Sequence, residues 1–124
     1  MNKILSKEVS FELAKLLKEK KYDKLCKSYY YNNGTDVLEP TTLTHNNNLA
    51  NSCCVAPTIA EVIDWVLEKY GIWISVSCDC GNDNLFYSKI FSTEIGIDRC
   101  IETIKNKDTP LEAYEEAIKY VLLN

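Results

Sequence analysis

The side chains best able to do chemistry in this sequence are six cysteines and one histidine. They are Cys26, Cys53, Cys54, Cys78, Cys80, Cys100 and His45. Together they exceed the four soft ligands that a tetrahedral zinc ion needs, but structural zinc sites commonly use pairs separated by two to four residues. Here one pair is adjacent and the other has a single spacer, so the sequence predicts no metal-binding residues.

A cysteine nucleophile would need a nearby base, and His45 is the only imidazole in the chain. Cys53 and Cys54 follow it closely enough to approach it. No glycine-rich oxyanion turn and no orienting partner accompany them, so we predict no catalytic residues.

Other reaction chemistries leave no motif in the sequence. A chain with four glycines has little material for a phosphate-binding loop, and it contains neither a Gly-x-Ser-x-Gly elbow nor a His-Glu-x-x-His pair. The acidic clusters follow helical spacing and are typical of solvated helix faces. We therefore expect no cofactor and favour a non-enzymatic protein.

The charge of the 124-residue chain is unevenly distributed. The net charge is −4 and the pI is about 5.0; this disfavours binding to duplexes in particular and argues against nucleic acid as a partner. Residues 1–27 contain eight lysines and four acids, for a net +4, and the remainder carries −8. The basic segment is expected to dock on the acidic body, within one chain or on a second copy in a homo-oligomer.

No apolar stretch has the length of a secretory signal or a membrane span. We expect a cytoplasmic protein without membrane contact, in which the cysteines are mostly reduced.

Two helices and a hairpin are predicted before residue 60. Ser10 can cap a helix ending at residues 20–22. An aromatic strand at 27–31, an Asn33-Gly34 turn and a returning strand at 35–38 form the hairpin. In residues 40–56 the apolar residues recur with neither a helical nor a strand period, which predicts a long loop. The second helix begins at the capping box of Thr58.

The second half predicts another hairpin and a final helix. After Gly71 the apolar residues recur at every second position, which predicts a strand. One face of this strand has Ile72, Ile74, Val76, Cys78 and Cys80, and the other has Trp73, Ser75, Ser77 and Asp79. Residues 85–92 return with Tyr87, Lys89 and Phe91 opposite Phe86, Ser88 and Ile90. Residues 98–105 fit a short helix or a strand. The last helix starts at Thr109-Pro110.

These elements predict one α+β domain over residues 1–124. Its three helices are expected to pack on one face of a small antiparallel sheet built from the two hairpins.

Surplus aromatic residues mark the predicted partner-binding surface. Phe11 lies opposite the apolar stripe of the first helix, Trp65 lies at the margin of the second, and Tyr29, Tyr30 and Tyr31 occupy both faces of the first hairpin strand. The alternative at each position is packing: a segment folded over Phe11, an edge strand for the tyrosines and a core edge closed by Trp65.

The order of segments resembles a known group of proteins. The segments that carry the resemblance are 11–20 (FELAKLLKEK), Tyr29-Tyr30, Ala56-Pro57-Thr58 leading into 62–72 (VIDWVLEKYGI), and 114–117 (YEEA). Their layout resembles small uncharacterised proteins encoded by phages, prophages and mobile elements of gut anaerobes. The resemblance implies an accessory protein and carries over no catalytic or binding residues.

The leading hypothesis is a non-enzymatic, protein-binding accessory module. The alternative is a small zinc-binding or thiol-redox protein that uses its cysteines.

Overall fold

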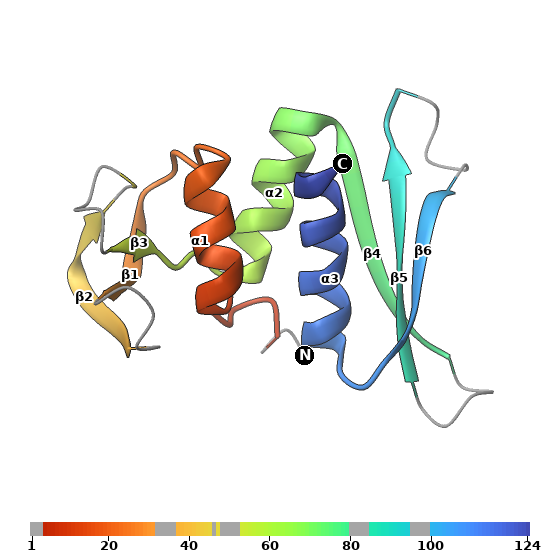
Figure 1. The fold of residues 1–124 in the computed structure, drawn as a ribbon, viewed down its shortest axis with the longest axis horizontal. Helices are drawn as coiled ribbons and strands as arrows, with labels where there is room; N and C mark the ends of the chain where they lie inside the picture. The colour runs from red at the N-terminus through yellow and green to blue at the C-terminus, as the bar shows by residue number, and fades with distance from the viewer. Residues whose placement is uncertain (1–3, 32–36, 46, 48–52, 80–84, 95–99) are drawn as a thin grey trace. The chain divides into compact units, whose positions relative to one another are not determined.

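The computed structural model describes residues 4–31, 37–45, 47, 53–79, 85–94 and 100–124 (Figure 1). Its elements, in chain order, are α1 (Phe11–Glu19), β1 (Cys26–Tyr31), β2 (Val37–His45), β3 (Cys54–Val55), α2 (Ile59–Tyr70), β4 (Ile72–Asp79), β5 (Leu85–Ser92), β6 (Cys100–Lys107) and α3 (Pro110–Leu123). The chain divides into two compact units. Residues 6–58 form the first unit, and residues 1–5 with 59–124 form the second.

The predicted α+β class and both predicted hairpins are confirmed. The hairpins lie in two antiparallel sheets, ordered β2-β1-β3 and β4-β5-β6, where the sequence led us to expect one sheet. Each hairpin gains its own third strand, β3 in the first unit and β6 in the second. Of the segment 98–105, whose sequence fitted a helix or a strand, residues 100–105 belong to strand β6; residues 98–99 lie outside the described residues.

The long loop predicted at 40–56 is shorter than expected. Strand β2 continues to His45, and its pairing with β1 shifts register between Cys26 and Ser28. Thr41, Thr42 and Thr44 are β-branched and favour a strand, which the aperiodic pattern of the segment concealed. Cys54–Val55 then pairs with β1 as β3. Residues 46 and 48–52 lie outside the described residues.

In the first unit, α1 packs against β3. The Ser10 hydroxyl accepts a hydrogen bond from the Leu13 amide (3.3 Å), so Ser10 caps the helix as predicted. Asn47 ties distant segments together: its amide nitrogen donates to the Tyr22 carbonyl (3.1 Å), and its amide oxygen accepts from the Val55 amide (3.0 Å). This bridge fixes β3 against the end of the helical segment.

In the second unit, α3 packs across all three strands and α2 packs on β4 and α3 (Figure 1). Thr109 caps α3 by accepting from the Glu112 amide (3.1 Å), and Pro110 takes the first helical position. Ala113 and Ala117 are fully buried, and their small side chains let α3 approach the sheet closely. Neither α2 nor α3 lies on the opposite side of the sheet (Figure 1).

The alternation predicted for β4 and β5 is confirmed. Ile74 pairs with Ile90, and both are buried, whereas Trp73 pairs with Phe91 and is 42% exposed. Strand β6 follows β5 with register shifts near both of its ends. Asn106 lies at one of them with φ of 63°. The sheet therefore has one face beneath α3 and one that α3 does not cover.

Ser88 is a buried polar residue on the covered face of β5. It is fully buried between Val76 and Ile104 on the neighbouring strands. Its hydroxyl has no hydrogen-bond partner among the described residues. Burying an unsatisfied hydroxyl costs free energy, so this position carries a stability penalty.

We expect Ser88→Ala to raise the free energy of unfolding by about 1 kcal/mol, because the unsatisfied hydroxyl is removed with little change in shape. Urea unfolding would show a higher midpoint with an unchanged slope. Ser75→Ala, on the opposite face of β4, is the matched control and should change stability by less than about 0.5 kcal/mol. A lower midpoint for Ser88→Ala would show that its hydroxyl is satisfied.

Candidate binding surface

The cysteines are distributed over both units. Cys26 and Cys54 are buried and Cys53 is half-buried in the first unit, while Cys78 and Cys100 are exposed in the second. Within the described ranges, no group of three or more metal-ligating side chains comes together. Cys80 and the His45 side chain lie outside the described residues, so the predicted approach of His45 to Cys53 or Cys54 is not placed.

Cys53 and Cys54 form a vicinal pair in the first unit. The Lys18 ammonium donates a hydrogen bond to the Cys53 carbonyl. Burial raises the pKa of the Cys54 thiol, and the positive charges of Lys18 and Lys15 only partly oppose this. Cys54 is therefore a thiol near neutral pH and a weak nucleophile.

Cys100 has the opposite character. Burial acts to raise the pKa of the Cys100 thiol. Hydrogen bonding with the Thr103 side chain and with the backbone of Ile90 and Glu102, together with the positive charge of Lys89, outweighs burial, and the pKa is lowered. The Cys100 sulfur lies 3.4 Å from the Thr103 hydroxyl and 2.9 Å from the Glu102 carbonyl.

We expect Cys100 to be alkylated by iodoacetamide faster than Cys54 at neutral pH, because a lowered pKa increases the thiolate fraction and a raised pKa decreases it. Peptide mass spectrometry over a time course measures both rates. Thr103→Val should slow the reaction at Cys100 alone. Faster labelling of Cys54 in the folded chain would contradict these assignments.

The predicted partner residues are mostly packed in the structure. The Phe11 ring meets the Tyr30 ring edge to face at 5.5 Å, so the β1 segment folds over Phe11. Tyr30 is 8% exposed, and its hydroxyl donates to the Val9 carbonyl (2.7 Å). Tyr29 is half-buried. The Tyr31 side chain lies outside the described residues.

Trp65, the fifth predicted partner residue, lies in the core of the second unit. It is 4% exposed. The Tyr70 ring packs edge to face on it at 5.7 Å, and the Lys69 ammonium lies 5.0 Å from its ring centroid. Trp65 is therefore packed in the core, which agrees with the alternative interpretation that it closes a core edge.

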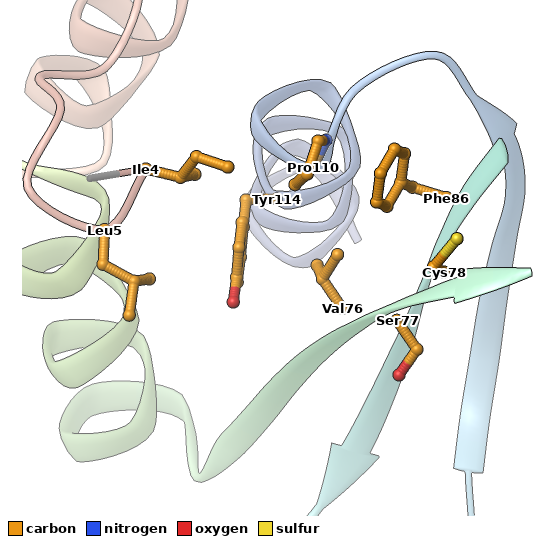
Figure 2. A pocket seen from close by; sticks show the side chains of 8 residues that line it. All are labelled: Ile4, Leu5, Val76, Ser77, Cys78, Phe86, Pro110 and Tyr114. Atoms are coloured by element: carbon orange, nitrogen blue, oxygen red, sulfur yellow. The ribbon is translucent and has the colours of Figure 1, made fainter. Parts of the chain in front are cut away.

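A hollow of about 240 Å³ lies where α3 begins, between the ends of β4 and β5. Figure 2 shows the Tyr114 ring extending into it between Leu5 and Val76, with its hydroxyl at the far end. Its eight lining residues are Ile4, Leu5, Val76, Ser77, Cys78, Phe86, Pro110 and Tyr114. Burial raises the pKa of Tyr114, which keeps the phenol neutral.

This hollow suits an apolar group of side-chain size. Small-molecule sites usually measure about 300–1,000 Å³, and the Ser77 side chain points away from the others in Figure 2. A second hollow, of about 320 Å³, lies at the other end of α3. It is lined by Tyr70, Ile72, Ile90, Ile101, Tyr120, Val121 and Asn124. Neither hollow brings together an acid and a base.

The face of the β4–β6 sheet turned away from α3 is a larger surface, which we call the open face. Cross-strand pairs define it: Trp73 beside Phe91, Ser77 beside Tyr87, and Lys89 between the two edge strands. Its described side chains are Trp73, Ser75, Ser77, Leu85, Tyr87, Lys89, Phe91, Cys100, Thr103 and Lys105. Asp79 pairs with Leu85 at the end of β4, and its side chain lies outside the described residues. Aromatic, hydroxyl and ammonium groups alternate across it.

The open face and the helix layer carry opposite charge. Among its described side chains, the open face has two lysines and no carboxylate, and the Lys89 ammonium lies 5.8 Å from the Tyr87 ring centroid. Exposed carboxylates of the second unit lie on the helices, at Glu61, Asp64 and Glu68 of α2 and Glu112 of α3, and just after β5 and β6, at Glu94 and Asp108. An anionic partner is therefore attracted to the sheet side.

Sequence reasoning placed these residues on their strand faces but did not choose them as a site. The alternation grouped Trp73 with two serines, and Tyr87 with Lys89 and Phe91. What it could not supply was the register that sets Trp73 beside Phe91. The signal that could have found the site is the presence of aromatic residues on the polar faces of β4 and β5.

No protein-family model, curated protein or solved structure matches the chain. In the part of the chain that the structure describes, each helix is too short or too polar to cross a membrane.

Proposed function

We propose that this chain is a non-enzymatic accessory module of the cytoplasm, which acts by binding a macromolecular partner on its open face. The observation that carries the proposal is the exposed Trp73, paired with Phe91 on a sheet face that neither α2 nor α3 covers. Large aromatic side chains are frequent anchors of binding surfaces because each buries much area at low entropic cost. The accessory role follows from the resemblance to phage-encoded proteins.

The two hollows support a binding role over a catalytic one. Their linings are mainly apolar. Burial raises the pKa of Tyr114, in the first hollow, further from neutrality. A general acid or base works best with a pKa near the working pH.

Site-specific photo-crosslinking in cells tests the proposal. A photoreactive amino acid at Ser77, which is exposed on the open face, should give adducts with a partner. The same amino acid at Glu112, which is exposed on α3, is the matched control and should give few. Adding Trp73→Ala should remove the Ser77 adducts. Equal crosslinking from both positions, or none from Ser77, would refute the open face as the binding surface.

A further inference from the structure

We propose that the partner of the open face is single-stranded nucleic acid. This inference rests on the proposed function and names the ligand of the same surface. It follows from the kinds of side chain that the β4–β6 sheet brings together and from their order on its strands.

The aromatic residues form two separate stacking positions. Trp73 and Phe91 are direct cross-strand neighbours on β4 and β5 and make one position. Tyr87 lies four residues before Phe91 on β5, which places the second position about 13 Å away along the strand. Unpaired bases stack on aromatic side chains irrespective of sequence, because every base has a π-face. Paired bases are already stacked on each other, so this platform selects single strands.

The remaining side chains of the face suit a sugar–phosphate backbone. Lys89 lies between the two stacking positions, beside Ser75 on β4 and Thr103 on β6. Lys105 follows Thr103 by two residues, and both lysines are exposed. An ammonium group can contact a phosphate, and hydroxyl groups can hydrogen-bond to phosphates, sugars or base edges. The carboxylates on α2 and α3 lie in the helix layer, where they do not repel a strand bound to the sheet.

A protein partner fits the composition of the face less well. Interface cores are enriched in aromatic residues but depleted in lysine and serine, and here lysine, serine and threonine separate the aromatics. Pairing through the β6 edge with a second copy is also disfavoured. Register shifts interrupt this edge, and Lys105, Asn106 and Lys107 lie along it; bulges and lysines are features that block strand addition.

The acidic net charge does not conflict with the inference. Duplex binding relies on neutralising many phosphates, whereas single strands gain much of their binding energy from stacking. Two lysines on a neutral aromatic platform would give weak binding with a shallow salt dependence.

The test measures binding of the full chain to a fluorescein-labelled oligothymidylate of about 15 nucleotides by anisotropy. Trp73→Ala should weaken binding about tenfold through the loss of one stacked base. The log–log salt slope should be about −1.4 for two phosphate contacts, and Lys89→Ala should make it about 0.7 shallower. Lys119→Ala, on α3, is the charge-matched control and should leave affinity and slope unchanged.

Tryptophan fluorescence locates the contact. The chain has two tryptophans, and Trp65 is buried, so stacking should quench Trp73 alone. Trp73→Phe should retain most of the binding, because phenylalanine also stacks, and should lose the quenching. Circular dichroism of each variant confirms that it is folded.

Three outcomes would overturn the inference. One is no binding at low salt, and another is equal affinity for wild type and folded Trp73→Ala. The third is equally tight, Trp73-dependent binding of polyglutamate, which would identify an acidic polypeptide as the ligand. In each case Ser77 crosslinking to a protein would leave the proposed function standing, whereas loss of all Ser77 adducts would remove both.

Discussion

Replacing Ile118 with alanine is expected to lower the free energy of unfolding by about 2–5 kcal/mol. Ile118 lies in the middle of α3 and is fully buried, next to Ala117. The substitution removes three buried carbon atoms and leaves a cavity in the layer between α3 and the elements packed against it. Closely packed interiors collapse only partly around such a cavity. Urea unfolding monitored by circular dichroism measures the loss.

The matched control is Ile101→Ala on β6, because Ile101 is 42% exposed. The same chemical change there should cost less than about 1 kcal/mol, since most of the side chain is already in contact with water. Similar losses at both positions would contradict the packing of α3 on the sheet.

Gly71→Ala is expected to cost about 2 kcal/mol. Gly71 ends α2 with φ of 67°, a conformation that costs an L-residue about 1–2 kcal/mol. An added Cβ would lie 3.0 Å from the Thr93 hydroxyl oxygen. That hydroxyl donates to the Gly71 carbonyl (2.9 Å) and would have to move.

A double-mutant cycle separates these two causes. In a Thr93→Ala background the crowded oxygen is absent, so Gly71→Ala should cost only the backbone strain, about 1 kcal/mol. The difference between the two backgrounds is the contribution of the crowding. Equal costs in both would show that Thr93 does not constrain the turn between α2 and β4.

The sequence predicted the elements that local chemistry determines. Ser10 and Thr109 cap their helices, and each cap depends on residues within one turn. The two-residue period after Gly71 likewise gave both faces of β4 correctly, because alternation is a property of a single strand.

Features that depend on distant pairing could not be predicted in the same way. The division into two sheets follows from β3 joining β1 and β6 joining β5, and nothing in a single segment encodes its neighbour. The extension of β2 to His45 depends on a shifted register with Cys26. An aperiodic segment can still pair if the opposite strand presents free backbone groups.

The two tryptophans show the same limit for the candidate site. Trp65 lies at the margin of a helical stripe and was predicted as a partner residue, but Tyr70 and Lys69 enclose it. Trp73 lies on the polar side of its strand, and the structure leaves it open beside Phe91. Helical and strand periods give the direction of a side chain but not which other element covers it.

Acrylamide quenching of tryptophan emission tests directly whether the open face presents Trp73 to solvent. The wild-type chain is predicted to show a readily quenched component, and Trp73→Phe should remove it and leave only the shielded emission of Trp65. Equal quenching of wild type and Trp73→Phe would contradict this arrangement, because Trp73 would then be no more accessible to solvent than Trp65.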